Sequence, residues 1–487
     1  MARLDLSQEA RWLGHFWLPD EPGNRQPGVL TYVPGEGLHL SLIGGFSDAA
    51  WIPRDSTTKL LSNRTRRWPL IQGHAERESI TLLGCAEVRG QMAGTGTAMY
   101  RQEIRANSAL VGIHIPAIDA PVFSGIELEV ENLGGWASEP DMTIEIEIES
   151  APRRWRVQTE PQESRFAEVE GTTIELGRRY TLPDFDPRRG SSAVSGEAVS
   201  YMQFQSKEPK ALGDWINYVP ILQDLLSLAL DTPCGVVRQV LIPAADIFED
   251  AAYDASARIL LLTNEMVVPR PTEPGIQSED ALFTLKDVDF AKVLPAWLAV
   301  RRQFLATCNM VIGAMYLSDP GYLASQVVTA VTAAEAMHRA LSVEPPIPQA
   351  EFNLLKKQLV EIVPADRRQW LREKLGRNDH TLRQRLEHLV KRLDPSLAEK
   401  LLPNPEKWAA AATSTRNGIA HEGGSTGDVE LMYAVVKVTQ AVVKMNLLSE
   451  LGISVERLQY ALATNRDFRS AARQARERWP AVVRTQE

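Results

Sequence analysis

The chain has 487 residues, more than one hydrophobic core usually supports, and its 44% hydrophobic and 24% charged residues are typical of a globular protein. This balance excludes a disordered or fibrous chain. Three widely spaced cysteines, Cys85, Cys234 and Cys308, exclude a disulfide scaffold and a cysteine metal site, and favour a cytoplasmic location.

The first 285 residues read mainly as strands. Residues 29–32 and 38–42 flank Pro34-Gly-Glu-Gly37, which predicts a hairpin with turn chemistry at its tip. Further strand-like runs are residues 79–85, 109–115, 125–131, 142–149 and 172–176, and one helix is expected over 220–230. Many short strands separated by turn signals predict an antiparallel, sandwich-like or barrel-like sheet.

A segment rich in proline and glycine, residues 268–275, is the best linker candidate. We therefore predict a β-rich domain over 1–280 and an all-α helical bundle over 281–487, an α+β multidomain protein. In the second domain the hydrophobic period changes to 3.6 residues. Helices are expected near 290–309, 322–341, 350–363, 381–393, 406–420, 429–451 and 455–479.

The charge of the chain changes sign at this linker. Residues 1–285 hold 25 Lys and Arg against 40 Asp and Glu, and residues 286–487 hold 28 against 22, so a net −15 and a net +6 sum to −9. The net charge of the whole chain argues against a nucleic-acid partner, but the net positive charge of residues 286–487 does not. The most apolar stretch, residues 293–315, is interrupted by Arg301 and Arg302, and we expect no membrane span.

The segment most informative about chemistry is 408–424, Trp-Ala-Ala-Ala-Ala-Thr-Ser-Thr-Arg-Asn-Gly-Ile-Ala-His-Glu-Gly-Gly. In a helix, a single stripe would face the core, formed by Trp408, Ala411, Ala412, Thr415 and Ile419. Asn417 and His421 then point away from that stripe as an i, i+4 pair. Gly423 and Gly424 would end the helix.

His421 thus lies at a helix carboxyl end, where the helix dipole favours an imidazolium and proton exchange near neutral pH is expected. Arg416 adds a planar cation suited to a phosphate. The two positions are about 140° and about 7.5 Å apart on the helix, so one copy makes a poor clamp. Two copies facing each other across a two-fold axis would pair these groups in one groove.

Arg416-Asn-Gly-Ile-Ala-His421 matches the Arg-x4-His signature of the HEPN superfamily of helical, metal-independent ribonucleases. The segments 333–339 and 381–393 resemble the HEPN branch of ApeA-like abortive-infection proteins. In the first half, residues 14–19, 28–32 and 80–84 resemble the strand-rich domain that precedes HEPN in that family.

The resemblance implies an antiphage effector that cleaves host RNA, tRNA included, by 2′-OH attack without a metal or another cofactor. His421 would act as acid and base, Arg416 would stabilise the phosphate, and Asn417 would orient the imidazole or the RNA. It further implies a homodimer or a higher even oligomer, and control through the first domain by a phage-derived protein. The alternative is a sensor or scaffold whose helical half binds RNA and dimerises without catalysis.

Glu335 shares a stripe with Ala324, Val328 and Val331, so its carboxylate is expected either to face the interior or to lie at a solvated edge. The resemblance favours a supporting role in the site, and Arg416 is the candidate partner.

Four arginines at helical spacing, Arg466, Arg469, Arg473 and Arg476, form a basic stripe that either tracks an RNA backbone or is a solvated helix face. His380 and His388 are expected at the surface. Two alternating acidic strands, 126–131 and 144–149, are expected to lie apart with wet outer faces, the alternative being one acidic face that meets a basic partner.

Overall fold

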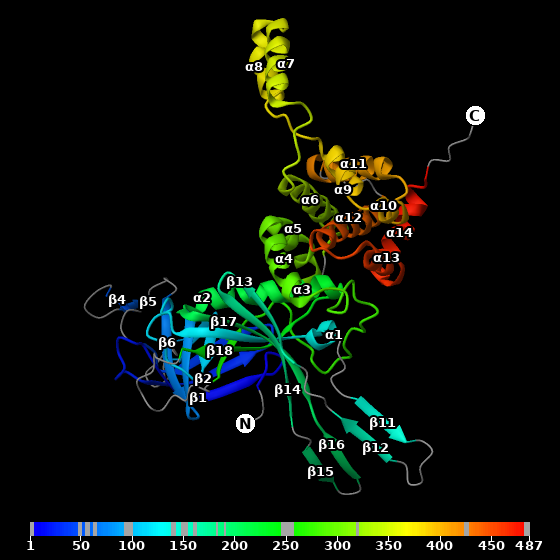
Figure 1. Cartoon of the computed structure of the whole chain (residues 1–487). Coiled ribbons are helices and arrows are strands. Elements are labelled where there is room, and N and C mark those ends of the chain that lie inside the picture. Colours follow the sequence, from blue (N-terminus) through cyan, green and yellow to red (C-terminus); the bar gives the residue numbers. More distant parts are fainter. Residues whose placement is uncertain are drawn as a thin grey trace. The chain divides into compact units, whose positions relative to one another are not determined.

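A computed structural model describes residues 4–46, 51–53, 59–61, 66–91, 101–137, 143–147, 154–158, 163–181, 184–188, 191–244, 258–317, 321–422 and 428–481. The chain forms two compact units. The strand unit comprises Met1–Ser227, Pro233–Ile276 and Asp289–Pro295, and the helical unit comprises Leu228–Thr232, Gln277–Val288 and Ala296–Glu487. The fold class is confirmed: a β-rich antiparallel region precedes a helical one (Figure 1). The domain boundary between residues 280 and 281 stays a prediction.

The strand unit is built on one large antiparallel sheet, with strand order β13-β14-β17-β10-β18-β19-β9-β7-β6-β1-β2-β3-β8. Its strands are β1 (Ala10–Trp17), β2 (Gln26–Val33), β3 (Gly37–Ile43), β6 (Arg67–Ala75), β7 (Glu78–Gln91), β8 (Arg101–Ala106), β9 (Ser108–Val111), β10 (Phe123–Val130), β13 (Arg165–Val169), β14 (Thr172–Tyr180), β17 (Ala198–Lys210), β18 (Val236–Pro243) and β19 (Ile259–Thr263). Three two-stranded sheets accompany it: β4 (Trp51–Pro53) with β5 (Lys59–Leu61), β11 (Thr143–Glu147) with β12 (Arg154–Gln158), and β15 (Asp184–Arg188) with β16 (Ser191–Ser195).

The long strand β7 closes part of this sheet into a barrel. Its residues 80–83 pair with β9, whereas residues 86–91 pair with β8, which is also hydrogen-bonded to β3. The ring β7-β6-β1-β2-β3-β8 therefore returns to β7, which removes free edges from this part of the sheet. The interior is filled by alternate apolar side chains, including Phe16, Leu30, Leu40 and Ile71, each fully buried.

The predicted hairpin is confirmed, because β2 pairs with β3 and Val33 lies opposite Gly37. Gly35 and Gly37 have φ values of +78° and +92°, the left-handed region that the turn requires and glycine tolerates best. The helix expected over 220–230 is α3 (Tyr218–Leu230), which follows α2 (Leu212–Ile216). Tyr218 at its start stacks on Phe204 of β17, with ring centroids 4.6 Å apart. The remaining helix of this region is the short α1 (Leu133–Ala137).

The two acidic strands lie apart, as expected, because β10 belongs to the large sheet and β11 forms a separate two-stranded sheet with β12 in the part of the chain that the structure describes. The expectation of wet outer faces is wrong for β10. Glu127 and Glu129 are 1% and 3% exposed. Arg179 of β14 donates to both carboxylates at 2.7 to 2.9 Å, and Arg238 of β18 lies 3.7 Å from Glu129. The acidic face is thus neutralised inside the strand unit.

The helices of the second half are α4 (Phe290–Gln303), α5 (Leu305–Val311), α6 (Leu323–Ala340), α7 (Gln349–Ile362), α8 (Arg368–Lys374), α9 (Leu382–Lys391), α10 (Pro395–Leu401), α11 (Pro405–Glu422), α12 (Val429–Glu450), α13 (Val455–Thr464) and α14 (Arg466–Arg478). The expected helices are confirmed with two corrections. The helix over 290–309 breaks at Phe304, and the helix over 455–479 breaks at Asn465, whose side chain caps α14. The short helices α8 and α10 were not predicted.

Helix α12 is the core of the helical unit, and α5, α6, α9, α11, α13 and α14 pack against it. By length and composition it could cross a membrane, with a mean hydropathy of 1.3, but 78% of this stretch is buried inside the protein. A buried core helix explains its apolar composition. Its Lys444 is buried and forms an ion pair with the equally buried Asp231.

Candidate functional site

Helix α11 carries the Arg-Asn-x3-His motif, and its buried face fixes the helix rotation. Trp408, Ala412 and Thr415 of the predicted stripe are buried, with exposed fractions of at most 1%, while Ala411 and Ile419 are half-buried. The core-facing stripe is therefore confirmed at its centre. The rest of the helix packs between α6, α9 and α12.

Arg416 and Asn417 lie on the more open side of α11. Arg416 is half-buried and Asn417 is exposed, and the Arg416 Nη1 donates to the Asn417 Oδ1 at 3.1 Å. The Arg416 Nε is buried and has no hydrogen-bond partner within the described residues. A buried donor without a partner is unfavourable by about 1–3 kcal/mol, and an anion placed against it would relieve this cost.

The last turn of α11 includes the backbone of His421. The side chain of His421 lies outside the described residues, as do Gly423 and Gly424. Because α11 continues from Arg416 to Glu422, the helix places the two motif positions about 140° and about 7.5 Å apart.

Glu335 on α6 does not pair with Arg416, contrary to expectation. Its carboxylate accepts from the Arg385 Nη1 of α9 at 2.6 Å and from the Arg339 Nη2 at 2.9 Å. The physical reason is that α9 presents Arg385 on the same side as its buried residues Leu386 and Leu389, so the guanidinium is 7% exposed and needs a carboxylate. The position of Arg385 on the apolar stripe of α9 was the sequence signal from which its burial could have been predicted.

Three histidines gather beside this ion pair, and His380 and His388, which were expected at the surface, are half-buried. His338 of α6 is buried, and its Nε2 is 3.1 Å from the Nδ1 of His388 on α9. The His380 ring is 4.6 Å from His388 and 5.5 Å from His338, centroid to centroid, and its Nε2 contacts the Glu344 carbonyl oxygen at 2.8 Å. Burial lowers the pKa of His338 to about 4 and also lowers the pKa of His388.

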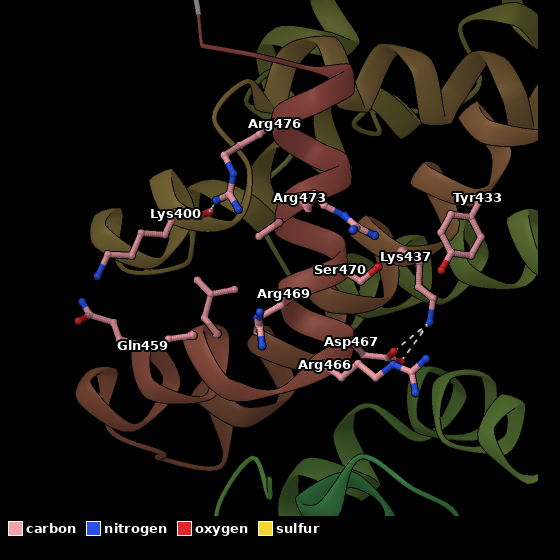
Figure 2. A pocket seen from close by; sticks show the side chains of 13 residues that line it. Lys400, Tyr433, Lys437, Gln459, Arg466, Asp467, Arg469, Ser470, Arg473 and Arg476 are labelled. Carbon is pink, nitrogen blue, oxygen red and sulfur yellow. Dashed lines mark hydrogen bonds and ion pairs between the residues drawn. The ribbon is translucent and has the colours of Figure 1, made fainter. Parts of the chain in front are cut away.

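The predicted arginine stripe lines a groove of about 920 Å³ in the helical unit (Figure 2). Arg466, Arg469, Arg473 and Arg476 project from α14 and are exposed. Lys400 of α10, Tyr433 and Lys437 of α12, and Gln459 of α13 also line it. These four residues were not predicted; Lys400, Tyr433 and Lys437 are far from the stripe in the sequence, whereas Gln459 precedes Arg466 by seven residues. None of the described residues that line this groove belongs to α11, so the groove brings the arginines together with one another but does not include the motif.

Within the described residues, no group of three or more His, Cys, Asp or Glu side chains is arranged to hold a metal ion. The three cysteines are buried, and no disulfide joins them. The described side chains of the motif offer the Arg416 guanidinium and the Asn417 amide.

The ApeA N-terminal domain 1 family matches residues 11–297, and the Apea-like HEPN family matches residues 328–457. No curated protein and no solved structure matches the chain. HEPN domains are generally ribonucleases that bind RNA and often dimerise. The first match covers more than half of the chain and the second covers α11 with its motif, so the chain belongs to the ApeA-like family of abortive-infection effectors with a HEPN domain.

Proposed function

We propose that this protein is a metal-independent endoribonuclease that cleaves host RNA, tRNA included, during phage infection. One His421 takes the proton from a ribose 2′-OH, and the 2′-oxygen attacks the adjacent phosphorus. The bond from phosphorus to the 5′-oxygen breaks, and the departing oxygen receives a proton from the second His421 of a dimer or from water. The products are a 2′,3′-cyclic phosphate and a 5′-OH.

The observation that carries this proposal is the state of Arg416. Its Nε is buried without a partner among the described residues, and Nη1 is held by Asn417, so the guanidinium is oriented and retains donors for a phosphate. Donors fixed before the reaction stabilise charge that develops on the phosphoryl oxygens. The HEPN match over the same helix supports the assignment. Glu335 acts indirectly, by holding α6 to α9 through Arg385.

Dimerisation is part of the proposal, because the two motif positions diverge on one helix. A second copy related by a two-fold axis brings a His421 toward the opposite Arg416. We further propose that the protein acts in the cytoplasm and that the first domain restrains the nuclease until a phage-derived protein binds. The acidic face of β10 is already neutralised by Arg179 and Arg238, so it does not supply this restraint.

The test compares the RNA fragments made by the full-length wild type, His421→Ala and Arg416→Ala. We expect wild-type fragments with a 2′,3′-cyclic phosphate and a 5′-OH, unchanged by EDTA, and at least a roughly hundredfold loss of cleavage in either variant. Lys407→Ala, exposed on the same helix, is the matched control and should cleave normally.

Cleavage that survives in His421→Ala would overturn the catalytic assignment. Fragments with 5′-phosphate ends, or cleavage abolished by EDTA, would overturn the metal-independent route. RNA binding and dimerisation without any cleavage by the wild type would instead support the non-catalytic sensor or scaffold.

A further inference from the structure

The groove beside α14 gathers positive charge from three helices. Its cationic side chains are Lys400, Lys437, Arg466, Arg469, Arg473 and Arg476. Asp467 is the one carboxylate among the lining residues, and it is already paired with the Lys437 Nζ at 3.1 Å. Figure 2 shows the arginines projecting from successive turns of α14. The groove therefore carries a strong net positive charge.

The arginines form a straight ladder because the opposite face of α14 is buried. Phe468, Ala471 and Ala475 pack into the unit, and Asn465 caps the helix by accepting from the backbone N–H groups of residues 467 and 468. Spacings of three, four and three residues place the four arginines within about 80° around the axis and along about 15 Å of helix. That length is enough for the arginines to lie beside several successive phosphates of one strand.

These four arginines do not take part in the ion pairs of the described structure. In the described part of the chain, no carboxylate forms an ion pair with Arg466, Arg469, Arg473 or Arg476, and the Arg476 Nη1 makes only a 3.4 Å contact with the Lys400 carbonyl oxygen. Arg478 on the same helix differs, because it pairs with Asp428 at 3.5 Å and with Glu430. Like charges held together without counter-charges favour binding of a polyanion.

The rim of the groove favours a single strand over a duplex. Tyr433 is 40% exposed and lies beside Lys437, whose Nζ is 6.0 Å from the ring centroid. Gln459, on the opposite helix α13, adds an amide that can bond to a base edge. Exposed aromatic rings beside a basic groove are how proteins hold unpaired strands, because each free base offers a face for stacking. The bases of a duplex are already stacked on one another.

We propose that this groove is a second RNA site, separate from the α11 motif, which holds a single-stranded segment of the substrate with its phosphates on the α14 arginines and a base on Tyr433. The inference rests on the proposed function, in that the RNA held here is the RNA cleaved at α11. Its consequence is that long, unpaired RNAs are preferred over substrates too short to occupy both sites.

The experiment measures binding of a labelled single-stranded RNA to the full chain in an Arg416→Ala background, from about 50 to 200 mM salt. In the triple variant Arg466→Gln, Arg469→Gln, Arg473→Gln we expect at least tenfold weaker binding at low salt. The slope of log K against log salt should shrink by about 2, since each lost phosphate contact in a single strand removes about 0.7.

The matched control removes the same charge elsewhere in the helical unit: Lys357→Gln, Arg372→Gln and Arg377→Gln, all exposed and outside the groove. It should leave affinity and slope near those of the parent. The triple Arg→Lys variant of α14 keeps the charge and should retain the slope, which separates lost charge from lost folding. Tyr433→Ala should weaken binding about tenfold, whereas Tyr433→Phe should not.

An affinity and slope in the α14 triple variant equal to those of the control would overturn the inference, and so would preferential binding of a duplex of the same sequence.

Cleavage of RNA is measured in a separate experiment. In a chain with intact Arg416, the α14 triple variant should cleave a dinucleotide at the wild-type rate and a long RNA more slowly. If the wild type binds RNA through the groove but cleaves nothing, the proposed function fails and so does the role of the groove in holding a substrate, while the groove itself remains an RNA-binding site.

Discussion

Two runs of like charge in this chain differ in their burial and in their pairing with opposite charges. Glu127 and Glu129 of β10 alternate along a strand in the sequence, yet both are buried and bonded to Arg179. Arg466, Arg469 and Arg473 of α14 repeat along a helix, yet they remain exposed without a carboxylate partner within the described residues. A run of like charges is therefore available to bind a ligand only where the neighbouring elements bring no opposite charge.

The strongest test of this comparison is Arg179→Ala. It removes the guanidinium that donates to the buried carboxylates of both Glu127 and Glu129, and we expect the free energy of unfolding of the strand unit to fall by about 3 kcal/mol. Chemical denaturation followed by strand-unit fluorescence measures it. Arg156→Ala is the control, because Arg156 pairs with Glu145 at an exposed site. A loss below about 1 kcal/mol would show that the buried carboxylates do not depend on Arg179.

The second largest loss in the free energy of unfolding is expected for Arg385→Ala in the helical unit. Removing this buried guanidinium leaves the half-buried Glu335 with Arg339 alone, so we expect a loss of about 2 kcal/mol in the free energy of unfolding. Arg383→Ala on the same helix removes an exposed i, i+4 pair with Glu387 and should cost at most about 0.5 kcal/mol. Equal effects of the two variants, measured by thermal unfolding, would contradict the structural role of the Glu335–Arg385 pair.

The histidine cluster predicts a smaller, pH-dependent effect. His338 has a pKa of about 4 in the folded protein against 6.5 for the ordinary side chain, because of burial and the charges of His388, His380 and Arg385. The unfolded chain therefore binds more protons between these values, so stability is fully present above about pH 6.5 and is lost as the pH falls toward 4.

We expect the helical unit to lose about 1–2 kcal/mol between about pH 7 and pH 5, measured by denaturation at each pH. His338→Gln should flatten this dependence, while His15→Gln at an exposed position of the strand unit should leave it unchanged. An unaltered acid dependence in His338→Gln would assign the loss to other groups.

The smallest expected change in stability is that of the α14 arginines. Each Arg→Gln substitution at 466, 469 or 473 should alter the free energy of unfolding by at most about 0.5 kcal/mol, because these side chains are exposed and form no ion pair in the described structure. Calorimetric unfolding of the triple variant provides the measurement. A loss above about 2 kcal/mol would mean that the stripe is structural, like Arg385, and would remove the contrast with β10.

Local patterns predicted much of the fold. The turn at Gly35 and Gly37, the strand alternation and most helices followed from short-range preferences, and Trp408, Ala412 and Thr415 fixed the buried side of α11. The break at Asn465 was missed because the apolar period continues across it, although an asparagine followed by Asp467 is a recognisable helix start. Helices α8 and α10, of seven residues each, are too short for a clear period.

The order of a strand-rich region and a helical region, the Arg416-Asn417-x3-His421 motif and the spacing of the α14 arginines can all be read from the amino-acid sequence. Which side chains meet became known from the folded chain: Arg179 with Glu127, Arg385 rather than Arg416 with Glu335, and Lys400, Tyr433 and Lys437 beside the stripe. The physical reason is that helix and strand periodicities are local properties of neighbouring residues. Ion pairs and grooves instead depend on which distant elements pack together, and the burial that makes a charge need a partner exists only after folding.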